Sequence, residues 1–317
     1  MTRTLRWAPR SFVRRSGYPE HATLKQTLYK YMLVQSEGAL ERLVAILRGR
    51  IYYSSPVNFN DPFEMSAMFD APDHHEVMAL LDETGPLTDL YLSKSARAKI
   101  YCQVRATLGT NRVVSREWIE SLGVLCLTTS PDDLLMWAHY AQNHTGICLG
   151  FDSGLEPFST AQPVRYQEGR ARVAPLNTVS REQQLVEKVL FVKSPHWRYE
   201  SEWRCIKRPV RDDEKAYYRD LYRQQPDKCD DIAQLLASEG GPGHYEFGVG
   251  ALRRIYLGAC MRPEWKERVV AAIDADAPLV KIHEMSLDSR YFKLNAQKLR
   301  DRSHQRPSTD TVRGRPR

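Results

Sequence analysis

The stretch LYKYMLVQSEGALERLVAILRGRIYYS, residues 28–54, sets the secondary-structure pattern of this chain. Its first seven residues are mostly aromatic and aliphatic and predict a strand over 28–34. Its last five, RIYYS, predict a second strand over 50–54. Between them, apolar residues recur with the spacing of an amphipathic helix. The chain therefore begins its folded part with a strand, a helix and a strand.

The helix between these strands has recognisable ends. Ser36 supplies an N-cap hydroxyl for a helix over 37–48. Leucine and valine at positions 40, 43, 44 and 47 share one face, as expected of a helix that packs on a sheet. Gly49 stands at the C′ position, where a left-handed residue ends many helices.

Further strands and helices follow without strict alternation. Strands are predicted at 123–128, 146–151, 164–166 and 254–258, with a last edge strand at 281–285. Helices are predicted at 132–141, 179–192 and 263–273, with charged helical sequence over 210–240. This mixture favours an α+β fold, a single mixed or antiparallel sheet with flanking helices, over a doubly wound sheet.

The predicted organisation is one domain between two basic tails. Residues 1–22 and 300–317 are predicted to be disordered, and 23–299 to form a single α+β domain with a helical insertion near 73–120. Of the net charge of +7, residues 1–18 contribute +5 and residues 300–317 contribute +4, so 19–299 carry −2. Basic tails of this kind either contact nucleic acid or have no partner.

Composition narrows the class of protein. A hydrophobic fraction of 42% and a charged fraction of 27% are typical of a soluble globular protein. No run approaches the roughly eighteen apolar residues of a membrane helix, and the N-terminal stretch lacks the apolar core of a secretory signal. The six Cys form no CxxC pair, so they predict buried thiols in a reducing cytoplasm, with neither a disulfide framework nor a metal site.

The segment KSPHWRYESEWR, residues 193–204, concentrates the chemistry. It holds two Trp, one Tyr, one His, two Glu, one Lys and two Arg. Unpaired charges stay out of protein cores, whereas aromatic side chains enter them. The mixture therefore indicates either a half-buried functional site or a buried Glu–Arg pair beneath aromatic rings. If 199–207 is a strand, Glu200, Glu202 and Arg204 lie on one of its faces.

Other residues are candidates for binding a flat ring and a ribose. Tyrosines and a serine lie on the two N-terminal strands, a Trp and a His lie in MWAHY, and an Asn lies in the turn-rich NFND. They are Tyr29, Lys30, Tyr31, Tyr52, Tyr53, Ser54, Asn60, Trp137 and His139. Each also has a plain structural interpretation, because Tyr is common in strands and Asn in turns. His139 and His144 are five apart, a poor spacing for two metal ligands on one helix.

The commonest nucleotide and hydrolase motifs are absent. The sequence contains no Walker lysine loop, no GxGxxG, no GxSxG and no HExxH. This excludes the most frequent P-loop, Rossmann, esterase and metalloprotease interpretations. A mechanism that needs only one carboxylate is still open.

Five motifs in order give the chain a family resemblance. They are LYKY, IYYSSPVNFNDPFE, LLMWAHYAQNHTGICLGF, KSPHWRYESEWR and IYLG. Together they resemble the bacterial family called domain of unknown function 2971, over roughly residues 28–262. That family has no settled general activity, so the resemblance does not by itself imply a reaction.

A second resemblance, to the ADP-ribosyltransferase fold, implies a mechanism. In that fold a His or Arg on the first strand holds the nicotinamide ribose, a Tyr, Ser or Thr on the second strand lies at the nicotinamide, and a late Glu stabilises an oxocarbenium-like transition state. By position, Lys30 or a flanking Tyr takes the first role, Tyr52, Tyr53 or Ser54 the second, and Glu202 or Glu200 the third. Lys30 departs from the pattern, because the fold has a His or Arg at this place. A lysine lacks the planar fork of donors that an arginine has.

The leading hypothesis is an ADP-ribosyltransferase-like enzyme that uses NAD as a substrate and no metal ion. Glu202 is preferred as the catalytic residue over Glu200, with Arg204 among the binding residues. The target is a macromolecule, namely RNA, DNA or a protein, and a toxin or phage-defence role fits such an enzyme. One alternative is a non-enzymatic module that binds a nucleotide or a partner. Another is a hydrolase or nuclease that uses Glu200, Glu202 and His196 or His139 as acid and base.

Overall fold

The chain divides into two compact units, each built from three segments. The computed structural model describes residues 26–69, 94–109, 116–173, 188–210, 212–224 and 239–300. The first unit comprises Met1–Leu24, Tyr52–Leu127 and Pro157–Tyr245, and the second comprises Lys25–Ile51, Thr128–Glu156 and Glu246–Arg317. The single domain over 23–299 stays a prediction. The predicted tails lie outside the described residues, apart from Arg300.

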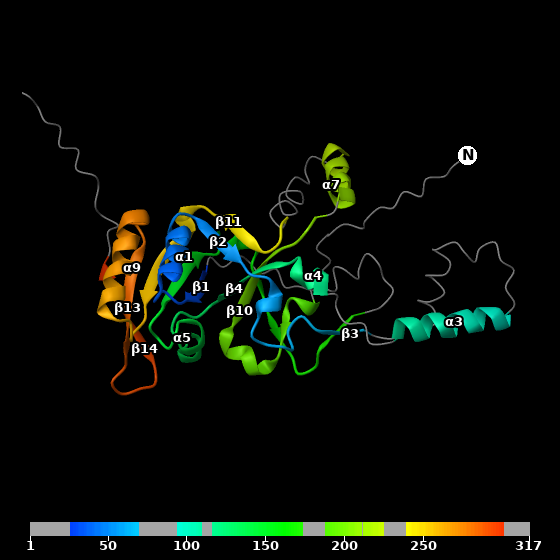
Figure 1. The fold of residues 1–317 in the computed structure, drawn as a ribbon, viewed down its shortest axis with the longest axis horizontal. Coiled ribbons are helices and arrows are strands. Elements are labelled where there is room, and N and C mark those ends of the chain that lie inside the picture. Colours follow the sequence, from blue (N-terminus) through cyan, green and yellow to red (C-terminus); the bar gives the residue numbers. More distant parts are fainter. Residues whose placement is uncertain are drawn as a thin grey trace, which may run out of the picture. The chain divides into compact units, whose positions relative to one another are not determined.

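The second unit is built on a mixed sheet with the strand order β14-β13-β12-β5-β1 (Figure 1). Its elements are β1 (Thr27–Met32), α1 (Glu37–Leu47), α5 (Leu134–Tyr140), β5 (Ile147–Asp152), η5 (Val249–Ala251), β12 (Leu252–Leu257), α9 (Pro263–Asp276), β13 (Lys281–Leu287) and β14 (Leu294–Arg300). β5 is antiparallel to β1 and β12, β12 is parallel to β13, and β13 is antiparallel to β14. The predicted α+β class with a mixed sheet is confirmed.

The parallel pair in this sheet depends on helix α9. Two parallel neighbours cannot be joined by a tight turn, so the chain needs a crossover, and α9 supplies it between β12 and β13. Helices α1 and α9 lie side by side (Figure 1). Ion pairs between Glu37 and Arg268 and between Arg48 and Asp276 join them. These pairs are largely exposed, so the apolar face of α1 contributes most of the packing.

The predicted ends of the first helix are confirmed. The Ser36 hydroxyl accepts a hydrogen bond from the backbone N–H of Ala39, at 3.3 Å. Gly49 follows the helix with φ +85°, and its carbonyl accepts from the N–H of Phe247 at 2.7 Å. A Cβ at Gly49 would lie 2.6 Å from the Phe247 carbonyl oxygen. Glycine is therefore required here both for conformation and for space.

We expect Gly49→Ala to destabilise the protein by roughly 1–3 kcal/mol, because it adds a strained φ and a backbone clash. Urea unfolding measures this loss. Gly38→Ala is the matched control, since Gly38 lies within α1 and a Cβ there meets nothing within 4 Å. The control is expected to be neutral or to stabilise by up to about 1 kcal/mol. Equal losses in the two variants would contradict the prediction.

The first unit contains shorter strands and more turns. Its elements are η1 (Pro56–Asn58), β3 (Ala67–Phe69), α3 (Lys94–Gly109), α4 (Arg116–Glu120), β4 (Gly123–Thr128), η2 (Phe158–Thr160), β6 (Gln162–Pro163), β7 (Arg165–Tyr166), β8 (Ala171–Val173), β9 (Val192–Lys193), η3 (Pro195–Glu200), β10 (Glu202–Lys207), α7 (Asp212–Gln224) and β11 (Gly243–Glu246). β2 (Arg50–Tyr53), β4 and β11 each extend over a boundary between the two units. β4, β10 and β6 follow in hydrogen-bonded order, while β3 pairs with β8 and β7 with β9.

An apolar core lies within the first unit. Its buried members come from segments that are distant in sequence, and partly buried aromatic residues such as Phe59 and Trp118 pack against them. The buried members are Met65, Leu122, Val173, Val189, Leu190 and Phe191. Their burial fixes the segments that carry the charged side chains described below.

Two strand predictions are wrong in detail. The strand at 281–285 is not the last or an edge strand, because β14 follows it and pairs with it. The strand over 199–207 begins only at Glu202, because residues 195–200 form the 3-10 helix η3. Pro195 fixes a helical φ at the start of η3, and Ser201 ends it with a left-handed φ of 44°. Of the predicted helix over 179–192, residues 179–187 lie outside the described residues. The helix ends before the predicted residue 192, because only 188–189 are helical, 190–191 form a turn and Val192 begins β9.

Candidate functional site

Five ionisable side chains of the first unit form one buried group, the charge cluster. Its members are Glu64, Lys193, Glu200, Glu202 and Arg204, and none of these side chains is more than 5% exposed. They come from the loop after η1, from β9, from the end of η3 and from β10. Charges are rarely buried at this level unless they are paired.

Arg204 organises one half of the charge cluster. Its Nε donates to Glu202 Oε1 at 2.8 Å and its Nη2 donates to Glu202 Oε2 at 2.9 Å, a bidentate pair. Nη2 also donates to Glu64 Oε2 at 2.6 Å, and Nη1 donates to the Leu190 carbonyl at 2.7 Å. The guanidinium carbon lies 5.3 Å from the centre of the Phe59 ring. The arginine is therefore fully engaged and fully buried.

Lys193 organises the other half. Its ammonium donates to Glu200 Oε2 at 2.5 Å and to Glu202 Oε2 at 3.2 Å. It also lies 2.9 Å from Glu64 Oε1, outside hydrogen-bond geometry, so that contact is an ion pair only. Glu202 thus has a cation on each side, since both Arg204 and Lys193 bind it.

The charge cluster contains three carboxylates and two cations. When all five groups are ionised, one negative charge is in excess. Inside a protein such a charge is screened much less than at the surface. In that state the cluster has a negative potential that favours a cation close to it.

Glu202 is held in its ionised form. Burial alone would raise the pKa of its carboxyl, but Arg204 and then Lys193 outweigh burial and hold the pKa at about 2. Burial would likewise lower the pKa of Lys193, yet Glu202, Glu64 and Glu200 raise it above its ordinary value. Because Glu202 stays ionised at physiological pH, it can stabilise positive charge but cannot donate a proton.

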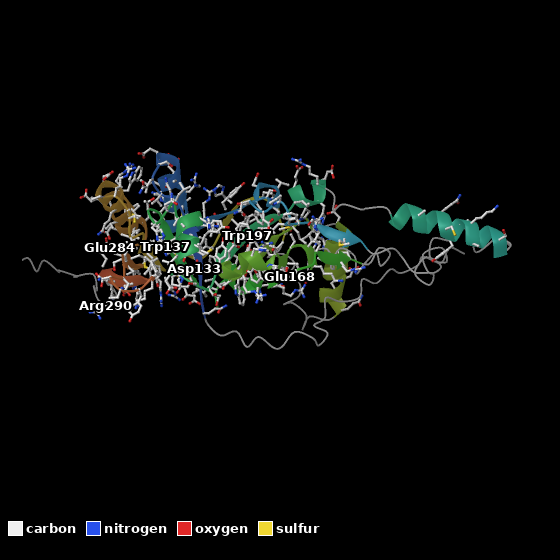
Figure 2. The ribbon with its side chains drawn as sticks, turned by 90° about the horizontal axis from the view of Figure 1, so that it is seen from below. Asp133, Trp137, Glu168, Trp197, Glu284 and Arg290 are labelled. Atoms are coloured by element: carbon white, nitrogen blue, oxygen red, sulfur yellow. The ribbon has the colours of Figure 1, made fainter. Side chains whose placement is uncertain are left out.

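Aromatic side chains cover the ammonium end of the charge cluster. The Trp197 ring (labelled in Figure 2) is half-buried, and its centre lies 4.8 Å from the Lys193 ammonium. The Tyr199 ring lies 6.1 Å from that of Trp197. Both rings are carried by η3, whose first turn is capped by the Ser194 hydroxyl. Glu202 is anchored from another side, because its backbone N–H donates to the Tyr166 hydroxyl oxygen at 2.9 Å.

The structure brings together three of the predicted site residues, Glu200, Glu202 and Arg204. They do not meet as three residues of one strand over 199–207, because they belong to two different elements. Glu202 and Arg204 are two apart on β10 and share its buried face. Glu200 reaches the same ammonium from the end of η3.

The other predicted residues of the first unit lie in different surroundings. Tyr52 is 44% exposed and its ring lies 5.0 Å from that of His244. Tyr53 is fully buried, with its ring 5.2 Å from that of Tyr245. Ser54 forms a bridge with Val124, and Asn60 is exposed in the loop after η1.

The remaining predicted residues belong to the second unit. Tyr29 and Tyr31 are buried on β1, where Tyr29 packs on Tyr256 and Tyr31 packs on Trp137. Trp137 is a core residue, since it is fully buried and its indole N–H donates to the Pro131 carbonyl at 2.9 Å. Lys30 is half-buried and His139 is exposed.

Sequence reasoning missed two members of the charge cluster as site residues, namely Lys193 and Glu64. A signal for both was present, because Lys193 opens the KSPHWRYESEWR segment and Glu64 closes NDPFE. Neither motif alone indicates the other, since the two residues are 129 positions apart in the sequence. Only the fold places the Lys193 ammonium 2.9 Å from Glu64 Oε1.

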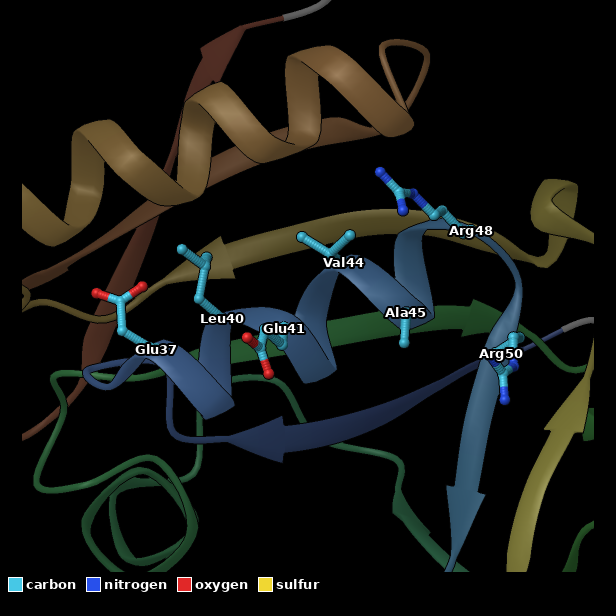
Figure 3. A pocket seen from close by; sticks show the side chains of 7 residues that line it. All are labelled: Glu37, Leu40, Glu41, Val44, Ala45, Arg48 and Arg50. Atoms are coloured by element: carbon cyan, nitrogen blue, oxygen red, sulfur yellow. The ribbon is translucent and has the colours of Figure 1, made fainter.

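A surface hollow lies elsewhere, on the exposed side of α1 in the second unit. Figure 3 shows that the α1 side chains from Glu37 to Arg48, together with Arg50, line it. Leu40, Val44 and Ala45 are its apolar lining, with Glu37 toward one end, Glu41 beside the middle and the two arginines toward the other end (Figure 3). None of the predicted site residues lines this hollow.

A family model described as protein of unknown function (DUF2971) matches residues 136–205. The chain resembles the DUF2971 family there. The matched region includes the whole KSPHWRYESEWR segment and most of LLMWAHYAQNHTGICLGF, so the predicted resemblance is confirmed over these residues. Its extension to 28–262 stays a prediction.

No curated protein and no solved structure matches the chain. Within the described residues, no helix is both long and apolar enough to cross a membrane. In the same part of the chain, no three His, Cys, Asp or Glu side chains are arranged to hold a metal ion. The three carboxylates of the charge cluster surround the Lys193 ammonium instead.

Proposed function

We propose that this DUF2971-like chain is an ADP-ribosyltransferase-like enzyme that cleaves the nicotinamide–ribose bond of NAD. Glu202 is its main catalytic carboxylate. One observation carries the proposal: Glu202 is ionised at neutral pH, in a buried group of three carboxylates and two cations. Cleavage of this bond develops positive charge on the ribose, and a fixed negative charge nearby lowers the energy of that transition state. The developing cation needs no proton from Glu202.

The same observation separates this proposal from a Glu-based hydrolase or nuclease. A general acid must hold a proton near neutral pH, which requires a pKa in that range. The pKa of Glu202 is held at about 2, so this residue does not serve as an acid. Acid–base catalysis would have to use other groups, such as the exposed His196.

Substrate access is part of the proposal. In the structure Glu202 is 5% exposed, so the ribose reaches it only when the cover over the cluster opens. We assign this cover to Trp197 and Tyr199 on η3. Ser201 follows η3 in a left-handed conformation, at the point where the chain turns from η3 into β10. Among the residues predicted to lie at nicotinamide, Tyr52 fits best because its ring is exposed, whereas the Tyr53 ring is buried.

The test is release of nicotinamide from NAD by the purified protein, with and without bacterial lysate and in the presence of a chelator. We expect release by the wild type and a loss of about a hundredfold or more in Glu202→Gln, the size typical of removing one electrostatic group from an active site. Glu168→Gln is the matched control, because Glu168 is an exposed glutamate of the same unit (Figure 2).

Circular dichroism and a thermal melt establish that Glu202→Gln is folded. Trp197→Ala provides an independent readout, because removing part of the cover changes KM for NAD while leaving Glu202 in place. Absence of nicotinamide release by the wild type under every condition would overturn the proposal. Release that is equal in Glu202→Gln and Glu168→Gln would overturn the assignment of Glu202. The macromolecular target, a bacterial cytoplasmic setting and a toxin or phage-defence role are parts of the same proposal.

A non-enzymatic binding module is the second candidate. The burial and complete pairing of Glu202 and Arg204 favour it, because paired and covered charges stabilise a fold without turnover. Isothermal titration with NAD and with ADP-ribose separates the two candidates. Saturable binding without any released nicotinamide would support the binding module.

A further inference from the structure

Two aromatic side chains are exposed to solvent in the loop that joins β13 to β14 in the second unit. Phe292 is 101% exposed and Tyr291 is 68% exposed. Figure 1 shows the connecting loop beyond the ends of the two strands. Neighbouring aromatic side chains usually bury most of their surface, so a pair that is mostly exposed indicates a surface that binds a partner.

The tip is held in one conformation by Asp288. One carboxylate oxygen of Asp288 accepts from the backbone N–H groups of Arg290 and Tyr291, each at 2.9 Å, and the other accepts from the Asn295 side chain at 2.9 Å. These hydrogen bonds hold the pKa of the Asp288 carboxyl below its usual range. The backbone N–H of Asp288 donates to the Lys293 carbonyl, which closes the loop. These hydrogen bonds hold the backbone that carries the two rings, so less backbone freedom is lost when the loop binds a partner.

Basic residues flank these rings in sequence, and one of them, Lys293, also forms an ion pair with Asp288 at 3.5 Å. Arg290 and Lys293 flank Tyr291 and Phe292 in sequence, and Figure 2 shows Arg290 at the outer margin of the hairpin. The Lys293 ammonium lies 5.5 Å from the centre of the Tyr291 ring. Lys298 follows on β14, and the sequence of residues 288–300 contains four cationic residues and one carboxylate, a net +3.

We propose that this hairpin binds single-stranded nucleic acid. Unpaired bases stack on Tyr291 and Phe292, and the phosphates contact Arg290, Lys293 and Lys298. Exposed rings with a basic track beside them are the combination that single-stranded nucleic acid recognises without sequence preference. Lys298 lies on β14, away from the tip that carries Arg290 and Lys293, and this spread of cations suits an extended polyanion better than a membrane surface that contacts only the tip. This inference does not depend on the proposed cleavage of NAD.

The test is fluorescence anisotropy of a labelled oligouridine with the full-length protein. The double variant Tyr291→Ala/Phe292→Ala is expected to bind at least about fivefold more weakly for each ring removed. Its melting temperature is expected to equal that of the wild type, because both rings are exposed. Leu279→Ala is the matched control, since Leu279 is also in the second unit and is 78% exposed. We expect this control to bind as the wild type does.

The two rings make it possible to distinguish binding by the hairpin from binding by the basic C-terminal tail. Residues 301–317 contain five Arg and no Phe, Tyr or Trp, so binding by the tail alone would depend on salt but not on the rings. We expect Arg290→Ala/Lys298→Ala to reduce the slope of log affinity against log salt by about one for each lost phosphate contact. Binding that is unchanged in the ring variant would overturn the proposal. Binding to phosphatidylserine vesicles that requires the rings, with no binding of the oligouridine, would also overturn it.

Discussion

Arg204→Met is expected to destabilise the protein by roughly 3–5 kcal/mol, the usual loss when one partner of a buried ion pair is removed. The side chain of Arg204 is 0% exposed and neutralises Glu202 and Glu64. Methionine retains much of its volume but no charge, so the excess negative charge of the cluster rises from one to two. The carboxylates left behind cannot recover their hydration without unfolding.

Urea unfolding at neutral pH measures this loss. Arg198→Met is the matched control, because Arg198 is an exposed arginine of η3 and is expected to change stability by less than about 0.5 kcal/mol. A loss below about 1 kcal/mol in Arg204→Met would contradict a structural role for the pair. The double variant Arg204→Met/Glu202→Gln is expected to lose less than the sum of the single variants, because it removes both members of the bidentate pair.

This prediction bears on function as well as on stability. The charge cluster both stabilises the first unit and, in the proposed mechanism, supplies the catalytic charge. A variant such as Glu202→Gln therefore changes two properties, and the melt that accompanies the NAD assay separates them. Trp197→Ala lies outside the ion pairs, so it alters access to the cluster with a smaller effect on stability.

The sequence predicts local structure well where the conformation of a residue depends only on its near neighbours in the sequence. Ser36 caps the first helix and Gly49 ends it in the structure as the sequence predicts, because capping and a positive φ depend on a few neighbouring residues. The strands at 123–128 and 146–151 are confirmed within a residue, because their runs are apolar and bounded by turns.

Predictions that depend on long-range pairing are less accurate. Periodicity alone extended β10 back to residue 199, whereas Pro195 and the left-handed Ser201 make residues 195–201 a 3-10 helix and a turn. β13 was predicted as an edge strand because β14 (LNAQKLR) is mostly polar and gives no apolar signal. Its pairing with β13 supplies the hydrogen bonds that its own side chains do not indicate.

In the candidate site, too, local sequence identifies some residues and long-range packing supplies another. The segment 193–204 identifies Glu200, Glu202 and Arg204 as a group, and it also suggests the buried Glu–Arg pair beneath aromatic rings that the structure contains. Glu64 cannot be assigned to this group from local sequence. Its carboxylate joins Arg204 across 140 positions, and such a contact follows only from the packing of the core around Met65 and Leu190.

The stability of the protein is expected to fall at high pH through Tyr166 and Lys193. Burial raises the pKa of Tyr166 from 10.0 to about 12, and the carboxylates raise the pKa of Lys193 above 10.5. Both folded values lie above the unfolded ones, so their contribution is complete below about pH 10 and is lost as pH rises through the folded values. Urea unfolding between pH 8 and pH 11 tests this, with Tyr166→Phe expected to show the shallower decline.

At low pH the free energy of unfolding changes with pH in the opposite direction, and a comparison with Glu202→Gln assigns part of this change to Glu202. The pKa of its carboxyl is lowered from 4.5 to about 2 in the folded protein, chiefly because Arg204 and Lys193 outweigh burial. An acid with a depressed folded pKa stabilises the protein above its unfolded pKa, and this contribution is lost as pH falls through the folded value. We therefore expect the free energy of unfolding to decline between about pH 5 and pH 2 more steeply in the wild type than in Glu202→Gln. Because all other carboxylates are common to both proteins, the difference in slope reports the proton that Glu202 takes up on unfolding. Parallel curves over this range would mean that the pKa of Glu202 is the same in the folded and unfolded protein, and the lowered pKa on which the proposal rests would be wrong.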